Sequence, residues 1–336
     1  MNHNKEETMN IEARFLAAAV VLGLAVAGYA QTAFSQVYPS KLVRIINAQG
    51  PGTLDVISRA YAQHLTKKWG QPVVVEQRAG AGSILAAEAV AKAEPDGHTL
   101  LVSSSAAYTV NQWVTKDMPY DPGRDLAPLF GLGVSVPTLT VSAKLGVSTV
   151  QELIALVNKS PGKYTFGSAG IGSATHLQCE VVMQEIGGLK MLHVPYKGIA
   201  DVARAITAGE VHMAFPAKPL IRGAISKGTV RVLAVVGDQR DPDLPDVPTL
   251  KEAGFPNSSG SLVWFGFAAP IKTPPALIQK IADDFLEISR EEDVKDLMRK
   301  ANFQPMHTGP KEFGALIARE RALVGRLIKD LGLDPK

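Results

Sequence analysis

The residues best suited to binding chemistry lie in one glycine-rich segment, 166–176, which reads FGSAGIGSATH and joins a strand-like run to a helical pattern. Its glycines, Gly167, Gly170 and Gly172, allow backbone conformations that turn successive N–H groups toward one concave side. Ser173 and Thr175 add hydroxyls near the positive end of the following helix. These donors suit a carboxylate or a phosphate. An ordinary strand-to-helix turn with a serine cap is the alternative.

Other loops carry similar donors where strand-like runs end. The loop NAQGPGTLD at 47–55 precedes a helix that Asp55 is placed to cap, and its candidate donors are Gly50, Gly52 and Thr53. The loop SSSAAYT at 103–109 offers three serine hydroxyls, and FPAKP at 215–219 offers the charge of Lys218. A plain Gly-Pro-Gly connector, capping serines and a solvated lysine are the alternatives.

The sequence gives little support for catalysis. A nucleophile elbow needs glycine two residues before the serine, but Phe166 precedes Ser168 and Ile171 precedes Ser173 in that position. Ser173 and His176 lie one helical turn apart, yet no carboxylate is placed to orient the histidine. We therefore expect a protein that is not an enzyme and assign His176 a structural role.

Neither a metal nor a cofactor is expected. The seven histidines form no HExxH pattern and have no close cysteine partners, as zinc would require. The segments GAGSIL at 80–85 and GIGSAT at 170–175 each lack the third glycine of the dinucleotide fingerprint.

The elements that position these loops alternate along the chain. Apolar β-rich runs at 42–46, 73–76, 99–103, 191–194 and 230–236 are separated by helical patterns, which is typical of a mainly parallel sheet covered by helices. One predicted helix follows the first run and ends at Gly70. Its apolar face carries Leu54, Ile57, Tyr61 and Leu65.

About 300 mature residues favour two α/β lobes rather than one. β segments near 129–143 and 259–270 are interpreted as two interlobe crossings. Lobe one then holds 36–137 plus 258–336, and lobe two holds 138–257. The loops above would meet at the cleft between the lobes, because ligands bind beyond the carboxyl ends of strands. An apolar stripe along 310–331 predicts a last helix packed on lobe one.

The first 35 residues are interpreted as a signal peptide. An apolar run at 15–28 follows Arg14 and is too short to span a membrane comfortably. Cleavage after Ala30 and cleavage after Ser35 both satisfy the small-residue rule, and translation from Met9 would remove part of an acidic leader. We expect a protein that is free in the periplasm.

The charge balance bears on possible binding partners, and the cysteine content bears on disulfide formation. The chain has 35 Lys and Arg against 32 Asp and Glu, with no basic cluster that would follow a nucleic-acid backbone, so nucleic-acid binding is not expected. The single Cys179 lies in a helical pattern with apolar neighbours and is predicted to be buried and inert.

Long segments of the mature chain resemble the Bug family, the periplasmic receptors of tripartite tricarboxylate transporters. They are GQPVVVEQRAGAG at 70–82, EPDGHTLL at 94–101, PYDPGRDLAP at 119–128, GSAGIGSATHL at 167–177, HVPYKG at 193–198, LPDVPTLKEAGFP at 244–256 and WFGFAAP at 264–270. The chain departs from the family pattern in its first loop, which lacks a Pro-Phe pair, and at His98 and His212.

The resemblance implies a two-lobed α/β protein of the periplasmic-binding-protein (Venus-flytrap) fold. Such a receptor closes on a small organic acid through its carboxylate and delivers it to membrane transporter subunits. A monomer that docks instead on a sensor kinase is the alternative, and a secreted hydrolase is a weaker one. Carried onto matching positions, the ligand contacts are Gln49, Gly50, Gly52, Thr53, Ser104, Ser105, Ser168, Gly172, Ser173, Ala217 and Lys218.

Overall fold

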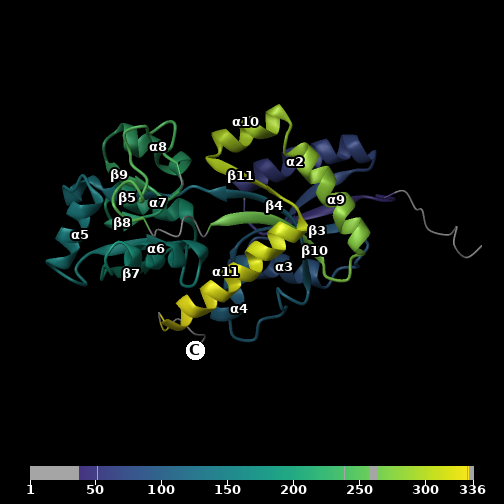
Figure 1. Ribbon diagram of the computed structural model, residues 1–336, viewed down its shortest axis with the longest axis horizontal. Coiled ribbons are helices and arrows are strands. Elements are labelled where there is room, and N and C mark those ends of the chain that lie inside the picture. Colours follow the sequence, from purple (N-terminus) through teal and green to yellow (C-terminus); the bar gives the residue numbers. More distant parts are fainter. Residues whose placement is uncertain (1–37, 51, 238, 257–262, 331, 333–336) are drawn as a thin grey trace, which may run out of the picture. The chain divides into compact units, whose positions relative to one another are not determined.

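The computed structural model describes residues 38–50, 52–237, 239–256, 263–330 and 332, and all its helices and strands lie within one compact unit, 41–336. The predicted signal peptide and the segment 257–262 lie outside the described residues. Figure 1 shows two sheets, each covered by helices. None of the described helices is both long enough and apolar enough to cross a membrane.

The first sheet has six strands in the order β11-β4-β10-β3-β1-β2. Its strands are β1 (Val43–Asn47), β2 (Val73–Gln77), β3 (Thr99–Ser104), β4 (Leu126–Ser135), β10 (Trp264–Pro270) and β11 (Phe303–Thr308). The predicted runs at 42–46, 73–76 and 99–103 correspond to β1, β2 and β3 within one residue at each end, so these predictions are confirmed.

Helices cover both faces of the first sheet. In Figure 1, α2 (Thr53–Trp69), α9 (Pro275–Ile288) and α10 (Glu292–Lys300) lie on one face, and α3 (Ile84–Ala91) and α11 (Pro310–Asp330) lie on the other. The predicted apolar face of α2 is buried, and Gly70 ends the helix in a left-handed conformation with φ 67°. An aromatic cluster joins α2 and α9 to the sheet through Tyr61, Phe130, Phe267 and Phe285. Three short helical turns complete this part: η1 (Ala81–Ser83), η2 (Ala106–Val110) and α4 (Asn111–Val114).

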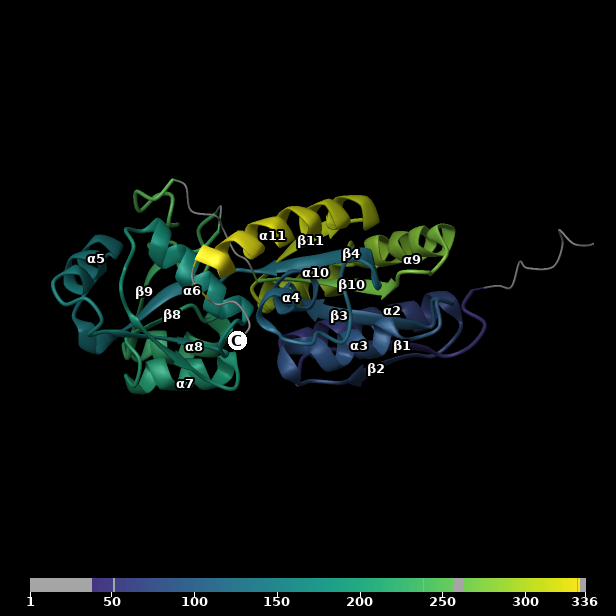
Figure 2. The ribbon, with the colours of Figure 1, turned by 90° about the horizontal axis from the view of Figure 1, so that it is seen from below.

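The second sheet has five strands in the order β7-β6-β8-β5-β9. They are β5 (Thr138–Ser142), β6 (Thr165–Ser168), β7 (Leu192–Pro195), β8 (Met213–Ala214) and β9 (Val230–Val235), with the short turn η3 (Ala143–Leu145) after β5. Figure 2 shows α5 (Val150–Asn158) and α6 (Ala174–Glu185) on one face and α7 (Ile199–Ala208) and α8 (Lys218–Ser226) on the other. Each face has its own buried apolar cluster.

The prediction of mainly parallel sheets is wrong, because both sheets are mixed. In the first, β1 pairs in parallel with β2 and β3, but β10 enters antiparallel between β3 and β4. In the second, β6 pairs in parallel with β7 and β8, but β5 is antiparallel to β8 and β9. The physical reason is connectivity: β4 and β10 are the strands next to the passages between the sheets, so they do not return through a helical crossover.

The chain passes from β4 in the first sheet to β5 in the second through two residues, Val136 and Pro137. The predicted lobe boundaries at 137/138 and 257/258 remain predictions. The last helix does more than pack on the first sheet: Val324 and Ile328 of α11 also join a buried cluster with Leu177 and Val181 of α6. Thus α11 ties elements that flank the two sheets.

Candidate functional site

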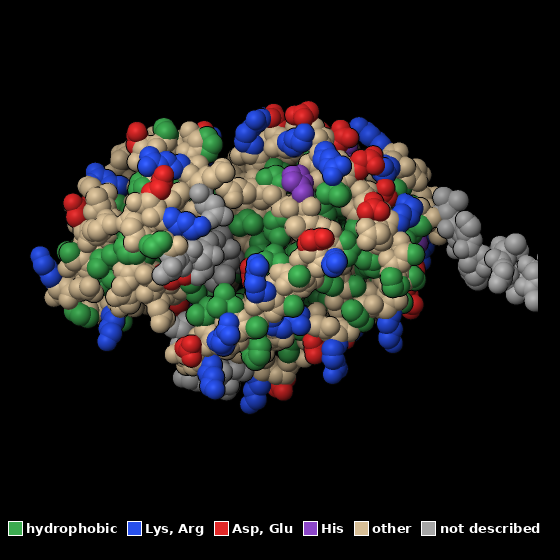
Figure 3. All heavy atoms as spheres, viewed as in Figure 1, with side chains coloured by type: hydrophobic (Ala, Val, Ile, Leu, Met, Phe, Trp, Pro, Cys, Tyr) green, Lys and Arg blue, Asp and Glu red, His purple; other side chains and the backbone are tan. Residues whose placement is uncertain are grey.

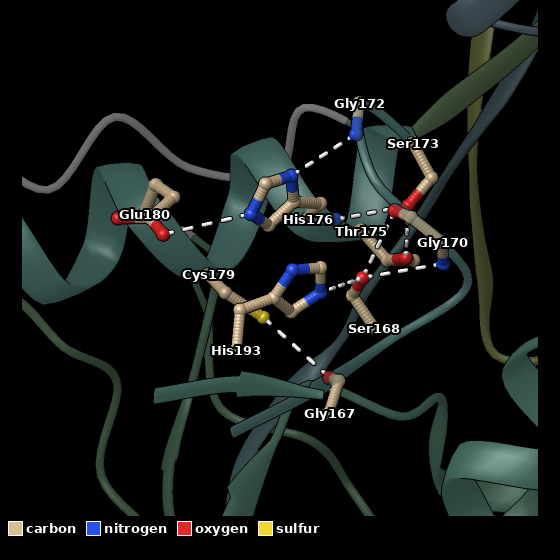
Figure 4. Close-up of polar contacts among 10 residues, drawn as sticks. All are labelled: Gly167, Ser168, Gly170, Gly172, Ser173, Thr175, His176, Cys179, Glu180 and His193. Carbon is tan, nitrogen blue, oxygen red and sulfur yellow. Dashed lines mark hydrogen bonds and ion pairs between the residues drawn. The ribbon is translucent and has the colours of Figure 1, made fainter. Parts of the chain in front are cut away.

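The glycine-rich segment forms a tight turn between β6 and α6 (Figure 4). Ser173 caps α6, because its Oγ accepts a hydrogen bond from the backbone N–H of His176 at 3.1 Å. Gly172 has φ +71°, a conformation that favours glycine, and a Cβ there would lie 2.9 Å from Cγ2 of Val114 in α4. The turn is therefore fixed both by its own backbone and by close approach to α4.

Several amide donors of this turn are already engaged within it. The N–H of Ala169 donates to Oγ1 of Thr175 at 3.0 Å, and the N–H of Gly170 donates to Oγ of Ser168 at 3.3 Å. The N–H of Gly172 donates to Nδ1 of His176 at 3.1 Å. An anion that used these amides would have to replace those bonds. The hydroxyl of Ser173 is also engaged, because its Oγ accepts the N–H of His176 and lies 3.0 Å from Oγ1 of Thr175.

Two histidines stack behind the turn, as Figure 4 shows. The ring centroids of His176 and His193 are 3.9 Å apart with an interplanar angle of 10°, and Phe166 stacks on His193 at 4.9 Å. Burial, followed by the proximity of His176, lowers the pKa of His193 to about 4. His176 accepts at Nδ1, so its Nε2 carries the proton and faces Oε1 of Glu180 at 3.6 Å.

Ser168 and His193 form a contact that resembles a nucleophile and its base. Oγ of Ser168 lies 2.7 Å from Nε2 of His193. However, Ser168 is fully buried, and its Oγ also bonds to the backbone of Gly170. The pair therefore holds β6, β7 and the turn together. Sequence reasoning missed His193. Its proximity to Ser168 depends on the parallel pairing of β6 with β7, which sets His193 opposite Phe166, and no local pattern specifies that pairing.

The loop after β1 lies next to the loop after β2. Oδ1 of Asn47 accepts the N–H of Gln49 at 2.9 Å, and Nε2 of Gln49 donates to Oγ of Ser83 at 3.3 Å. Nδ2 of Asn47 is buried and has no hydrogen-bond partner among the described residues. A Cβ added at Gly50 or at Gly52 would meet no atom within 4 Å, so this loop has free space around it.

Asp55 does not cap α2, so that expectation is wrong. The helix begins at Thr53 after Gly52, and no side chain caps it. Asp55 instead lies in the first turn, where Nε of Arg59 donates to its Oδ2 at 2.9 Å. This bond is the main cause of the lowered pKa of Asp55.

The serines at the end of β3 lie beside the loop after β1, because β1 and β3 are parallel neighbours. Ser105 is buried, and its N–H donates to the carbonyl of Trp264 at 2.8 Å. Ser104 is the last residue of β3 and is 7% exposed. Ser104 thus lies at the carboxyl end of β3, at the same edge of the sheet as the loop after β1.

Lys218 is not a free cation. It is the first residue of α8 and is buried, and its Nζ pairs with Oδ1 of Asp241 and, at 2.8 Å, with Oδ2 of Asp243. The carboxylates of Asp241 and Asp243, which follow β9, thus compensate its charge. Ala217, which precedes α8, bridges to Pro137.

The structure brings the predicted residues into two groups. One group follows the carboxyl ends of β1 and β3, and the other follows β6 and β8, which are also parallel neighbours. Gly172 of the second group contacts Val114, which follows β3 in the chain. Tyr196 lies beside the glycine-rich turn, because its N–H donates to the carbonyl of Ser168 at 2.9 Å. Tyr196 and Lys197 also line an open hollow of about 740 Å³ at the end of β7 that includes Asp201, Arg204 and Glu210.

Charge is spread evenly on the face shown in Figure 3, where basic and acidic side chains are interspersed. Two mixed α/β sheets joined by a short passage, with polar turns at the carboxyl ends of their parallel strands, define a two-lobed binding protein of the Venus-flytrap class. The prediction of this fold class is confirmed.

The chain belongs to the tripartite tricarboxylate transporter family receptors, whose family model matches residues 57–333. It is 30% identical to the protein BugT of Bordetella pertussis over 94% of this chain and 97% of that protein. The resemblance to the Bug family is thereby confirmed. This family and its structural neighbours are binding proteins of the periplasm.

Two solved structures are similar over most of the chain. Rpa4515 of R. palustris, solved with adipate, has a TM-score of 0.79 and 28% identity, covering 89% of this chain and 100% of that one. MatC of Rhodopseudomonas palustris, solved with bound malate, has a TM-score of 0.73 and 25% identity, covering 87% and 100%.

Proposed function

We propose that this protein is a periplasmic solute receptor that captures a small organic acid by its carboxylate and delivers it to a tripartite tricarboxylate-type membrane transporter. The observation that carries the proposal is the family match over 57–333, supported by two structural neighbours that hold the dicarboxylates adipate and malate. The protein makes and breaks no bond in the acid. It is exported by the N-terminal signal peptide and acts as a monomer.

The donors available for a carboxylate are mainly neutral. Hydroxyls of Ser104 and Ser173 and the open loop at 48–53 lie at the carboxyl ends of β3, β6 and β1, whereas Lys218 is neutralised by its aspartates. A hydrogen bond to a charged group contributes about 1.5 to 3 kcal/mol, so three or four such bonds are consistent with about micromolar affinity after ordering costs.

Ligand binding would bias the relative population of lobe arrangements. A ligand that contacts donors from both sheets binds one arrangement better than others, and its differential affinity is the free energy available for the shift. Neutral donors also allow release, since no buried ion pair has to be separated when the acid leaves.

The proposal is tested by isothermal titration calorimetry with a panel of mono-, di- and tricarboxylates, alongside thermal unfolding with each acid. We expect at least one acid to bind and to raise the unfolding temperature. Ser104→Ala should lower the affinity for that acid about 10- to 100-fold, which corresponds to the loss of one charge-assisted hydrogen bond. The control is Ser226→Ala, an exposed serine late in α8. A folded protein that binds none of the acids refutes the proposal.

A further inference from the structure

We infer that the acid recognised here has a hydrocarbon body, so that the site selects alkyl or aromatic carboxylic acids over compact hydroxylated ones. This inference rests on the proposed function and concerns the part of the ligand beyond its carboxylate. Two features of the connections that follow β1, β2, β6 and β8 support it. Large aliphatic side chains are exposed there, and the charged side chains in their described parts form ion pairs with neighbouring residues.

Each of four strand-to-helix connections, taken together with the first turn of its helix, carries one large aliphatic side chain that is left exposed. The most exposed is Ile171, at 72%, which lies between Gly170 and Gly172 at the tip of the glycine-rich turn. The others are 52%, 50% and 44% exposed and lie in the first turns of α2, α3 and α8; they are Val56, Leu85 and Leu220.

The register of the parallel strands places these four connections at two edges. β1 and β2 run parallel, so the connections that lead into α2 and α3 leave the first sheet at the same edge. β6 and β8 run parallel, so the turn with Ile171 and the connection to α8 leave the second sheet at one edge. The close approach of Gly172 to Val114 places the turn beside α4, which follows β3 in the chain.

The charged side chains in the described parts of these connections, 48–56, 78–85, 169–173 and 215–222, are all paired. Asp55 binds Arg59, and Arg78 binds Glu76 at 2.7 Å. Lys218 and Arg222 both pair with Asp243, and Lys218 also pairs with Asp241. A ligand therefore meets neutral donors and aliphatic surface here, with no unpaired basic side chain in those described stretches for additional acidic groups.

This combination favours an apolar body over a hydroxylated one. A buried methylene adds about fourfold to affinity when it leaves water for aliphatic contacts. A hydroxyl that is buried against Ile171 and its counterparts loses its water partners and finds no replacement there. Isolated exposed aliphatics are common on surfaces, but here one occurs in each of the four stretches 48–56, 78–85, 169–173 and 215–222.

The test compares acids of equal length and charge by isothermal titration calorimetry. Adipate is paired with galactarate and hexanoate with gluconate, because within each pair the main difference is the hydroxyl groups on the chain. We expect the unsubstituted acid to bind at least tenfold tighter in each pair, with a more negative heat-capacity change from apolar burial. Equal or tighter binding of the hydroxylated acids overturns the inference while leaving the proposed function intact.

The variant Ile171→Asn tests whether the glycine-rich turn causes the selectivity for unsubstituted acids. We expect it to reduce the adipate-to-galactarate affinity ratio about tenfold. Ile271→Asn is the matched control, because Ile271 is 42% exposed but follows β10, which is antiparallel to β3, and so lies at the opposite edge. A ratio that both variants leave unchanged overturns the inference. If none of the four acids binds the folded protein, the inference fails, whereas the proposed function fails only if the wider panel of carboxylates also shows no binding.

Discussion

Glu320 gives a prediction whose magnitude follows from its surroundings. This carboxyl lies on α11, is only 9% exposed, and accepts a hydrogen bond from Nε1 of Trp264. Trp264 in turn stacks on Tyr108 with ring centroids 5.5 Å apart. Burial raises the pKa of Glu320 from 4.5 to about 7, although the indole N–H opposes this. The folded protein therefore holds this proton more tightly than the unfolded chain does.

The direction of the effect on stability follows from that difference. The contribution of Glu320 to the free energy of unfolding is fully present below about pH 4.5 and is lost as the pH rises through about 7. At about 1.4 kcal/mol per pKa unit, the loss between pH 5 and pH 8 is about 2 to 3 kcal/mol. Glu320→Gln keeps an acceptor for the indole and cannot ionise, so it should abolish this loss.

The assay is urea unfolding at pH 5, 6, 7 and 8, followed by tryptophan fluorescence. The free energy of unfolding of Glu320→Gln, relative to that of wild type, should rise by about 2 to 3 kcal/mol between pH 5 and pH 8. Glu312→Gln, which removes an exposed carboxylate from the same helix, should keep the wild-type slope. A difference between Glu320→Gln and wild type that stays constant across this range refutes the reasoning.

Two further substitutions test the packing of the site. Gly172→Ala should destabilise the protein by about 2 to 4 kcal/mol, because it combines a left-handed φ with a 2.9 Å clash on Val114, and calorimetric unfolding would show it. An unchanged melting temperature would contradict the close approach. Lys218→Met should cost about 3 to 5 kcal/mol by leaving Asp241 buried and unpaired, and adding Asp241→Asn should recover most of the loss in denaturant unfolding. A double variant no more stable than the single one would exclude this cause.

Local pattern made several elements predictable from the sequence. The apolar spacing of Leu54, Ile57, Tyr61 and Leu65 predicts the buried face of α2, and Gly70 predicts its end, because both are properties of one helix. Cys179 is buried, as its helical neighbours indicated, and burial raises the pKa of its thiol. Strand positions followed from apolar runs for the same reason.

The candidate site was only partly predictable. The glycines and hydroxyls of 166–176 indicated a polar turn before a helix, and the turn is there. The sequence did not indicate that the N–H groups of Ala169, Gly170 and Gly172 bond within the turn. Nor did it indicate the partners of Lys218, because Asp241 lies 23 residues away in another loop.

Several of the strands and helices, the polar turns and the family could be derived from the amino-acid order, since each depends on residues that are close together along the chain. The pairing of the strands emerged only from the folded arrangement, and with it the stacking of His176 on His193 and the burial of Glu320 against Trp264. Those contacts join residues that are far apart along the chain, and their energies depend on a strand register and a helix placement that no local pattern specifies.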